Sequence, residues 1–257
     1  GLPYEVAGET VNRLCASGMA SVIHASRAIL ADSGDLFISG GVEHMTRGPW
    51  VISKSSKAFG RDAQMHDSSF GWRFVNPKLH DAYGTDGMGV TAENLVDKYG
   101  ISRADQDEFA LWSQKKTAAA QASGFFKDEI TSIEIPRRKM DPLIFDKDEF
   151  PRSNTTAETL GGLRAAFKKN GSVTAGNASG LNDGAAALLI ASSQAVQEYG
   201  LKPLVRIVSS AVASSTSVSS TGVDSAVVSS VLVGVVSNSS AGLLSSVIII
   251  VVVCVLT

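Results

Sequence analysis

The 257-residue sequence predicts an α/β fold, and three observations carry this prediction. An apolar, helix-like segment at 16–33 precedes a short apolar strand at 36–39, and with a strand or turn at 4–12 they make a βαβ-like unit. Continuous apolar runs at 185–190 and 204–210 have the composition of buried strands. Helices and strands therefore alternate along the chain.

Two helices in the middle of the chain carry their own end signals. The first is expected from Met88 to Tyr99, where Gly100 ends it. The second begins after Ser102, a good N-cap with Asp105 three residues on, and runs to Ser123. The helix at 16–33 is so apolar that we expect it to be buried on most sides, and Gly40-Gly41 is expected to end the strand at 36–39.

The segments between these elements are less regular. Residues 46–87 hold scattered aromatic residues, Gly and Pro with no sustained period, and 128–170 alternate charges with short apolar pieces. Loops and edge strands are expected in both segments. This change of character at Thr46 indicates a separate domain inserted into the main fold.

Composition excludes several classes of function. The chain is 44% hydrophobic with a formal net charge of −2, so nothing favours binding to nucleic acid or an anionic membrane. Cys15 and Cys254 are its two cysteines, which indicates a reducing compartment, and a cytoplasmic location is expected. No signal-peptide pattern or initiator Met opens the chain, and phosphate-binding glycine loops are absent.

The tail has an unusual composition. From Ile207 to Thr257 the only charged residue is Asp224. Its final run, Val247–Thr257, is shorter than the about 20 apolar residues of a membrane-spanning helix. A buried strand is the better interpretation of this run.

Cys15 is the strongest candidate for a reactive residue. It stands just before the helix at 16–33, where the positive end of the helix dipole and unpaired N–H groups favour a thiolate, which is a nucleophile. A lone Cys is more often a small buried hydrophobic residue, so the surrounding sequence must decide.

That sequence resembles the thiolases. Residues 10–19 (TVNRLCASGM) are similar to the family's nucleophile motif, 40–47 (GGVEHMTR) to a second motif and 174–186 (TAGNASGLNDGAA) to a third, in the family's order. The resemblance covers about residues 1–213. It implies a five-layer α/β/α/β/α thiolase-like fold with an inserted loop domain.

The implied domain boundaries follow from this resemblance. Residues 1–45 and 170–213 would form the N-terminal core, and 46–169 the inserted loop domain that binds CoA. Residues 214–257 would begin the C-terminal half, which is incomplete here, and a piece before Gly1 is expected to be missing. The tail is either a faulty reading of the real second half, which we prefer, or the true end of a degenerate fragment.

The resemblance also implies the chemistry. Cys15 would carry the acyl group in a ping-pong acyl transfer that cleaves a 3-ketoacyl-CoA with CoA, or runs in reverse as a Claisen condensation. Thiolases use further groups from a Gly-His-Pro segment, an Asn-Glu-Ala-Phe segment and a second Cys, none of which this sequence contains. Cys254 lacks the expected Gly-rich turn. His24 is expected to be packed against a partner, His44 to be structural, and His66 and His80 to be surface residues.

Six residues match family positions that bind CoA or substrate. They are Met88, Arg164, Phe167, Ala175, Ala178 and Ser179. A core Met and a simple turn are the alternatives for Met88 and Ser179. The resemblance implies CoA as a substrate, no permanently bound cofactor and no metal. It implies a homodimer or homotetramer that has acyl-CoA and CoA as ligands and binds neither nucleic acid nor membranes.

One segment indicates a branch of the family. Residues 70–77 (FGWRFVNP) resemble thiolases of aromatic-compound breakdown that act on 3-oxoadipyl-CoA, whereas the resemblance to the family as a whole implies fatty acid metabolism and β-oxidation. Arg73 would then meet the free carboxylate of the substrate, or be an ordinary surface residue. A catalytically silent acyl-CoA-binding protein is the alternative to an active thiolase. The long insertion at 46–169 argues against a ketoacyl synthase.

Overall fold

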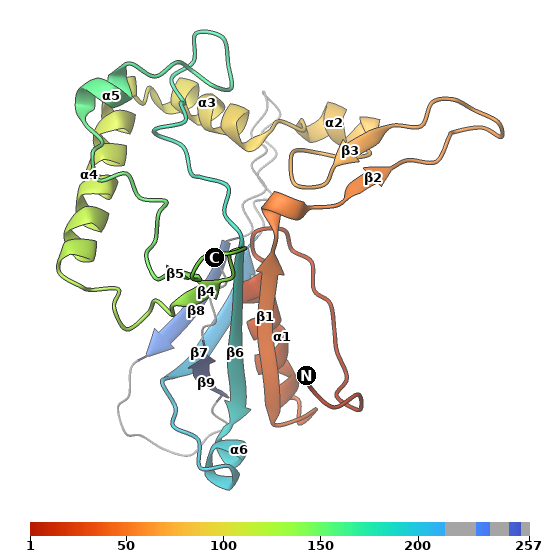
Figure 1. Ribbon diagram of the computed structural model, residues 1–257. Coiled ribbons are helices and arrows are strands. Elements are labelled where there is room, and N and C mark those ends of the chain that lie inside the picture. Colours follow the sequence, from red (N-terminus) through yellow and green to blue (C-terminus); the bar gives the residue numbers. More distant parts are fainter. Residues whose placement is uncertain (214–229, 237–246, 253–257) are drawn as a thin grey trace. The chain divides into compact units, whose positions relative to one another are not determined.

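The computed structural model describes residues 1–213, 230–236 and 247–252. The chain divides into two compact units (Figure 1). Unit 1 consists of residues 1–84 and 181–257, and unit 2 of residues 85–180. Unit 1 is therefore built from two separate stretches of sequence, whereas unit 2 is continuous.

Unit 1 is built on a five-stranded sheet. Its strands are β1 (Leu36–Glu43), β6 (Gly184–Ser192), β9 (Val247–Val252), β7 (Val205–Ala213) and β8 (Ser230–Val236), in that spatial order. Each pair of neighbours is antiparallel. The register of the first pair places Leu36 opposite Ala191 and Glu43 opposite Gly184.

Helix α1 (Ser17–Leu30) covers this sheet with its apolar stripe. Val22, Ala25 and Ile29 pack with Ile190 of β6 and Ile207 of β7 in one buried cluster. The spacing of the three helical residues places them on one face, as a half-buried helix requires. Arg27 and Leu30 on the other side are exposed, so the helix is less completely buried than its composition predicts. Helix α6 (Ser193–Glu198) follows β6 directly.

The predicted end of the strand at Gly40-Gly41 is wrong, because β1 continues through both glycines to Glu43. A Cβ atom at Gly40 would lie 2.3 Å from the carbonyl oxygen of Ala186 in β6. Here glycine permits a close approach of two backbones rather than ending the strand.

The predicted βαβ-like unit is also not formed. Residues 4–12 contain no strand, and they are exposed or half-exposed. The stretch is tied to α1 by Glu9, whose Oε1 lies 2.9 Å from Nδ1 of His24. Residues 4–12 contain two acidic residues and a glycine and have little apolar surface to bury in a sheet. The contact between Glu9 and His24 holds the segment instead.

The rest of unit 1 before Gly84 consists of short elements. A 3-10 turn (Met45–Arg47) leads into the antiparallel pair β2 (Trp50–Ile52) and β3 (Met65–Asp67). Helix α2 (Pro77–Tyr83) follows, capped by Asn76, whose side chain accepts a hydrogen bond from the N–H of Lys78. Residues 46–87 show no helical period, so the sequence did not predict α2.

Unit 2 contains the two helices with clear end signals. Helix α3 (Met88–Tyr99) ends at Gly100, which has φ +64°, and α4 (Arg103–Ala122) begins with a capping box between Ser102 and Asp105. Both predictions are confirmed. The strands β4 (Ile133–Ile135) and β5 (Leu143–Phe145) pair with each other, and α5 (Ala157–Gly161) is short.

The units differ from the predicted domains at both boundaries. Residues 46–84, predicted to lie in the inserted domain, belong to unit 1, and 170–180 belong to unit 2. The strands between residues 46 and 169 form two separate two-stranded sheets. The CoA-binding role of the insertion stays a prediction.

The described parts of the tail are two strands. Residues Val247–Val252, the described part of the Val/Ile run, form β9, which pairs with β6 and β7, while β8 pairs with β7. They thus lie in the sheet of unit 1. That residues 214–257 begin a C-terminal half stays a prediction. Within the part of the chain that the structure describes, no helix has the length and hydropathy needed to cross a membrane.

Candidate active site

Cys15 lies on a tight turn immediately before α1. Its predecessor Leu14 has φ +50°, a left-handed conformation that costs a non-glycine residue about 1–2 kcal/mol. Asn12 stabilises the turn, since its Oδ1 accepts a hydrogen bond from the N–H of Leu14 at 3.0 Å. Strain of this kind persists only where the surroundings hold it, and it is concentrated at functional sites.

Ser17 holds the other side of the same turn. Its Oγ accepts a hydrogen bond from the N–H of Arg13 at 2.8 Å and donates one to the carbonyl of Leu14 at 2.7 Å. Asn12 and Ser17 therefore fix the backbone next to Cys15. Its own side chain is exposed and is not in a disulfide.

The start of α1 is open. At its N-cap, Ala16, none of the described side chains makes a capping hydrogen bond. The N–H groups of Ala16 and Ser17 instead donate to the carbonyls of Arg13 and Leu14, each at 3.0 Å, so the turn itself satisfies part of the helix N-terminus. The predicted position of Cys15, at the N-terminal end of a helix with a buried face, is confirmed.

The second and third motifs meet in unit 1. Asp183 accepts hydrogen bonds from the backbone N–H and the hydroxyl of Thr46, and its Oδ2 lies 3.2 Å from Nε2 of His44. The Thr46 hydroxyl, the Thr46 N–H and the nearby His44 hold the pKa of Asp183 below its usual range. His44 therefore pairs with the third motif, and its structural role stays a prediction.

This pairing should make part of the stability of unit 1 depend on pH. A lowered pKa stabilises the folded state above the ordinary Asp range, near pH 4, and that contribution is lost as the pH falls through the folded value. We expect Asp183→Asn to lower the melting temperature at pH 7 and to have a smaller effect at pH 3. Thermal melts at both pH values test this, with Asp35→Asn as the control. Equal effects of Asp183→Asn at both pH values would contradict it.

Two further histidines have clear surroundings. His24 has the expected partner, Glu9. His66 was predicted to be a surface residue and is half-buried: its ring lies 5.2 Å from that of Phe74 in an edge-to-face contact, and its Nε2 is buried without a hydrogen bond to any described residue. Cys254 lies outside the described residues.

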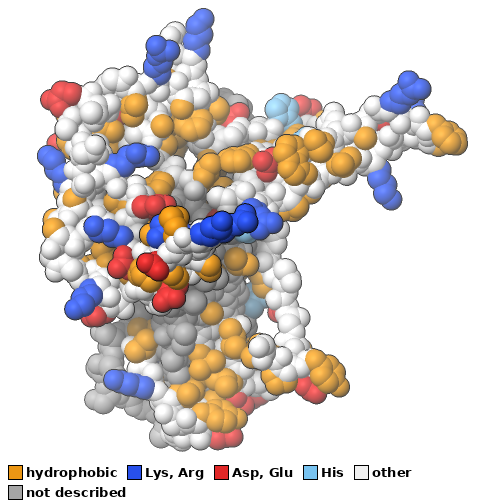
Figure 2. Space-filling view, in the orientation of Figure 1, with side chains coloured by type: hydrophobic (Ala, Val, Ile, Leu, Met, Phe, Trp, Pro, Cys, Tyr) orange, Lys and Arg blue, Asp and Glu red, His pale blue; other side chains and the backbone are white. Residues whose placement is uncertain are grey.

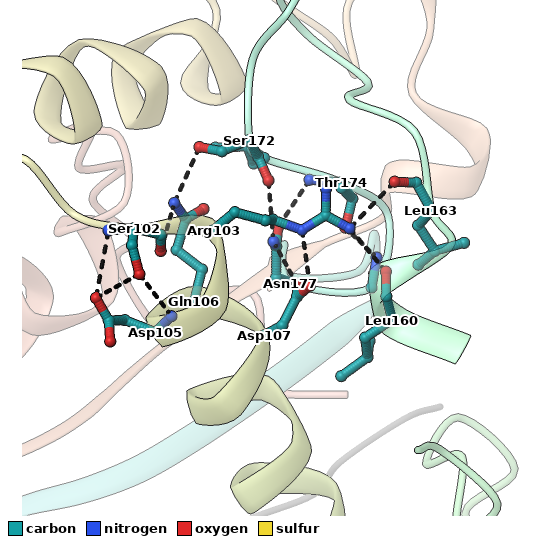
Figure 3. A network of polar contacts seen from close by, with 12 residues as sticks. Ser102, Arg103, Asp105, Gln106, Asp107, Leu160, Leu163, Ser172, Thr174 and Asn177 are labelled. Carbon is teal, nitrogen blue, oxygen red and sulfur yellow. Dashed lines mark hydrogen bonds and ion pairs between the residues drawn. The ribbon is translucent and has the colours of Figure 1, made fainter. Parts of the chain in front are cut away.

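Unit 2 contains a network of polar contacts around Asp107 of α4 (Figure 3). Nε of Arg103 donates to Oδ2 of Asp107 at 2.7 Å, and Nη2 of Arg103 donates to the carbonyl of Leu160 at 2.7 Å. Asn177 donates to Oδ1 of Asp107 at 2.9 Å, and its own oxygen accepts from the N–H of Thr174 at 2.7 Å. One buried carboxylate thus joins α4 to the third motif.

Glu93 of α3 binds the same segment from another side. It is 1% exposed, and its Oε1 accepts hydrogen bonds from the N–H groups of Ser172 at 2.9 Å and Val173 at 2.8 Å. A Cβ at Gly171 would lie 2.3 Å from that oxygen, so a larger residue there would displace the carboxylate. The structural roles of Glu93 and Asp107 were not predicted. One signal in the sequence could have indicated that Glu93 is buried, because it falls on the same helix face as the apolar residues Val90 and Val96.

All six predicted binding residues lie in unit 2, whereas Cys15 lies in unit 1. Met88 begins α3 and is 79% exposed. The ring of Phe167 packs against the next residue, Gly89, since a Cβ there would lie 2.2 Å from it. The others lie on the segments that the polar network holds and are exposed or half-exposed; they are Arg164, Ala175, Ala178 and Ser179.

Comparison with known proteins gives a consistent picture. The family model of the thiolase N-terminal domain matches residues 1–194. A beta-ketoadipyl-CoA thiolase of Acinetobacter baylyi is 54% identical over 210 residues, which are 82% of this chain and 52% of the relative. A 3-oxoadipyl-CoA/3-oxo-5,6-dehydrosuberyl-CoA thiolase of Escherichia coli is 52% identical over 213 residues, 83% of this chain and 53% of the relative.

Solved structures agree with the sequence comparisons. The crystal structure of human mitochondrial 3-ketoacyl-CoA thiolase superimposes with a TM-score of 0.70 at 38% identity, covering 83% of this chain and 53% of that one. Its complex with CoA gives a TM-score of 0.65 at 37% identity, covering 79% and 49%. The chain spans about half the length of the relatives that it matches. Its fold is that of the thiolases, as the three motifs predicted, and the chain belongs to the thiolase family.

Proposed function

We propose that this chain provides the nucleophile and CoA contacts of an acyl-CoA C-acyltransferase. The observation that carries the proposal is the position of Cys15, an exposed thiol on a constrained turn at the uncapped start of α1. A thiolate in that place is accessible to a large substrate and close to backbone N–H groups. The membership of the thiolase family supplies the class of reaction.

The reaction has two halves. The thiolate of Cys15 attacks the ketone carbon of a 3-ketoacyl-CoA, and the bond between the ketone carbon and its α-carbon breaks. Acetyl-CoA leaves as an enolate and takes a proton, while the shortened acyl group stays on Sγ as a thioester. The thiolate of a second CoA then attacks this thioester and restores Cys15. The reverse order is the Claisen condensation.

Unit 2 is proposed to bind CoA. Arg164 is exposed and would face the phosphates of the nucleotide, and the ring of Phe167 packs nearby, against the start of α3. Met88, Ala175, Ala178 and Ser179 would line the path of the pantetheine arm. Glu93 and Asn177 fix the backbone of that segment, so its shape would be in place before CoA arrives.

The names of the relatives support one class of substrate. Beta-ketoadipyl-CoA and 3-oxoadipyl-CoA are two names of one compound, which carries a free carboxylate at the far end of the acyl chain. We therefore propose 3-oxo-dicarboxylyl-CoA substrates from aromatic-compound breakdown in preference to the fatty acyl-CoA substrates of β-oxidation. A homodimer or homotetramer in the cytoplasm completes the proposal.

Mass spectrometry of the acylated protein tests the central step. With 3-oxoadipyl-CoA at mildly alkaline pH, where ordinary thiols are partly ionised, we expect a succinyl adduct on the peptide that contains Cys15. Cys15→Ser should lower the rate of this acylation about a thousandfold or more. Iodoacetamide should label the same residue first, since it is exposed.

The control variant is Ser33→Ala, a small polar change beyond the C-terminal end of α1 that leaves the turn intact. It should acylate as the parent chain does. Binding of CoA without any adduct would contradict catalysis and favour a silent acyl-CoA-binding protein. An adduct on Cys254 instead would contradict the role of Cys15.

A further inference from the structure

We infer that Arg73 recognises the acyl-terminal carboxylate of the substrate and thereby selects dicarboxylic acyl groups. The inference rests on the proposed function, since it names the residue that would bind the end of the acyl group farthest from the thioester. It concerns unit 1, the unit that also holds Cys15, to which the acyl group would be attached.

The guanidinium of Arg73 is fixed by its own loop. Its Nη1 donates hydrogen bonds to the carbonyl of Ser68 at 3.1 Å and to the carbonyl of Gly71 at 3.0 Å. The other edge, formed by Nε and Nη2, makes no hydrogen bond to any residue that the structure describes. This edge has the two parallel N–H groups that bind a carboxylate in a bidentate manner.

Arg73 differs from the other cations of unit 1. Among the described residues of that unit, no other Lys or Arg has its charged group held by a hydrogen bond. Nor does any described Asp or Glu pair with Arg73. A cation that is already oriented and not neutralised loses less entropy when it binds an anion than a free surface side chain does.

The loop around Arg73 has a defined and strained backbone. Gly71 has φ +63° and Phe74 has φ +49°, a conformation that is rare and costly for a bulky residue. Phe74 is held by its edge-to-face contact with His66, which lies on β3 opposite Val51 of β2. The loop is therefore anchored to the β2–β3 pair rather than free.

The loop that carries Arg73 holds three partly exposed aromatic residues. Trp72 and Phe74, the neighbours of Arg73, are 49% and 53% exposed, and Phe70 is 52% exposed. Figure 2 shows hydrophobic side chains gathered over the part of unit 1 that holds β2, β3 and α2. Exposed aromatic side chains on the same loop as a fixed guanidinium would suit a ligand with an aliphatic chain ending in a carboxylate, because both parts of the ligand would then find a matching surface.

The test compares two ligands that differ only at the end of the acyl chain. Calorimetric titration of the full chain with adipyl-CoA and with hexanoyl-CoA gives the two dissociation constants. We expect adipyl-CoA to bind about tenfold more tightly or better, as hydrogen bonds to a charged group predict. Arg73→Gln should remove this preference and leave the dissociation constant of hexanoyl-CoA unchanged.

Two further variants make the result specific. Arg73→Lys keeps the charge but not the bidentate edge, so it should retain only part of the preference. Lys202→Gln removes an equal charge from an exposed loop of unit 1 and should retain all of it.

The outcomes separate this inference from the proposed function. A preference for adipyl-CoA that survives in Arg73→Gln, or no preference in the parent chain, would overturn the role of Arg73 alone. An equal loss of affinity for both ligands in Arg73→Gln would show a structural role and would also overturn it. Failure of the parent chain to bind either ligand would contradict the proposed CoA site, and this inference with it.

Discussion

Glu93→Leu is expected to lower the free energy of unfolding of unit 2 by about 2–5 kcal/mol. Leucine fills a similar volume but accepts no hydrogen bond, so the N–H groups of Ser172 and Val173 lose the carboxylate oxygen that they share. Each buried donor left unpaired costs about 1–3 kcal/mol. The variant also no longer buries the charge of Glu93, and this gain offsets part of the cost of the two unpaired donors. We therefore expect a loss within the stated range and not above it.

Urea unfolding and hydrogen exchange of residues 168–178 measure the effect. The amides of Ser172 and Val173 should lose protection first, before the centre of α4. Glu108→Leu is the matched control, because Glu108 is an exposed residue of α4. A Glu93→Leu variant within about 0.5 kcal/mol of the parent chain, the range of ordinary surface substitutions, would contradict the role of Glu93.

Gly40→Ala is expected to destabilise unit 1 by about 1–3 kcal/mol, since the new methyl group would lie 2.3 Å from the carbonyl oxygen of Ala186. That oxygen belongs to the backbone of β6, so the two strands must separate to make room. The next residue provides the control. A Cβ at Gly41 meets no described atom within 4 Å, so Gly41→Ala should be neutral or slightly stabilising.

Thermal unfolding of both variants at neutral pH tests the pair. The melting temperature of Gly40→Ala should fall, whereas that of Gly41→Ala should stay near that of the parent chain. Equal changes would show that the spacing of β1 and β6 is not set by Gly40.

Elements with local end signals could be predicted from the sequence. Gly100 and the Ser102–Asp105 pair define the ends of α3 and α4 through contacts within a few residues, and both helices are found where these signals place them. Cys15 could be predicted because its motif is local as well. The left-handed Leu14 could not, since leucine disfavours that conformation and only the bonds from Asn12 and Ser17 hold it there.

Features that depend on distant residues could not be predicted in this way. The passage of β1 through Gly40 depends on β6, and the role of Glu93 depends on Ser172 and Val173. Asp183 and Thr46 belong to two motifs that the sequence keeps far apart. In each case the role of the residue depends on a partner that is distant in the sequence, and no local sequence pattern identifies that partner.

The division of unit 1 into two stretches has a consequence for biosynthesis. Leu36 pairs with Ala191, so β1 leaves the ribosome well before its partner strand exists. At about 5–20 residues per second, that delay is about 10–30 s. During this interval the apolar side of α1 lacks Ile190 of β6 and Ile207 of β7, and every residue of unit 2 is synthesised before β6 is complete. We therefore expect the nascent chain to need a chaperone at α1 until β6 emerges.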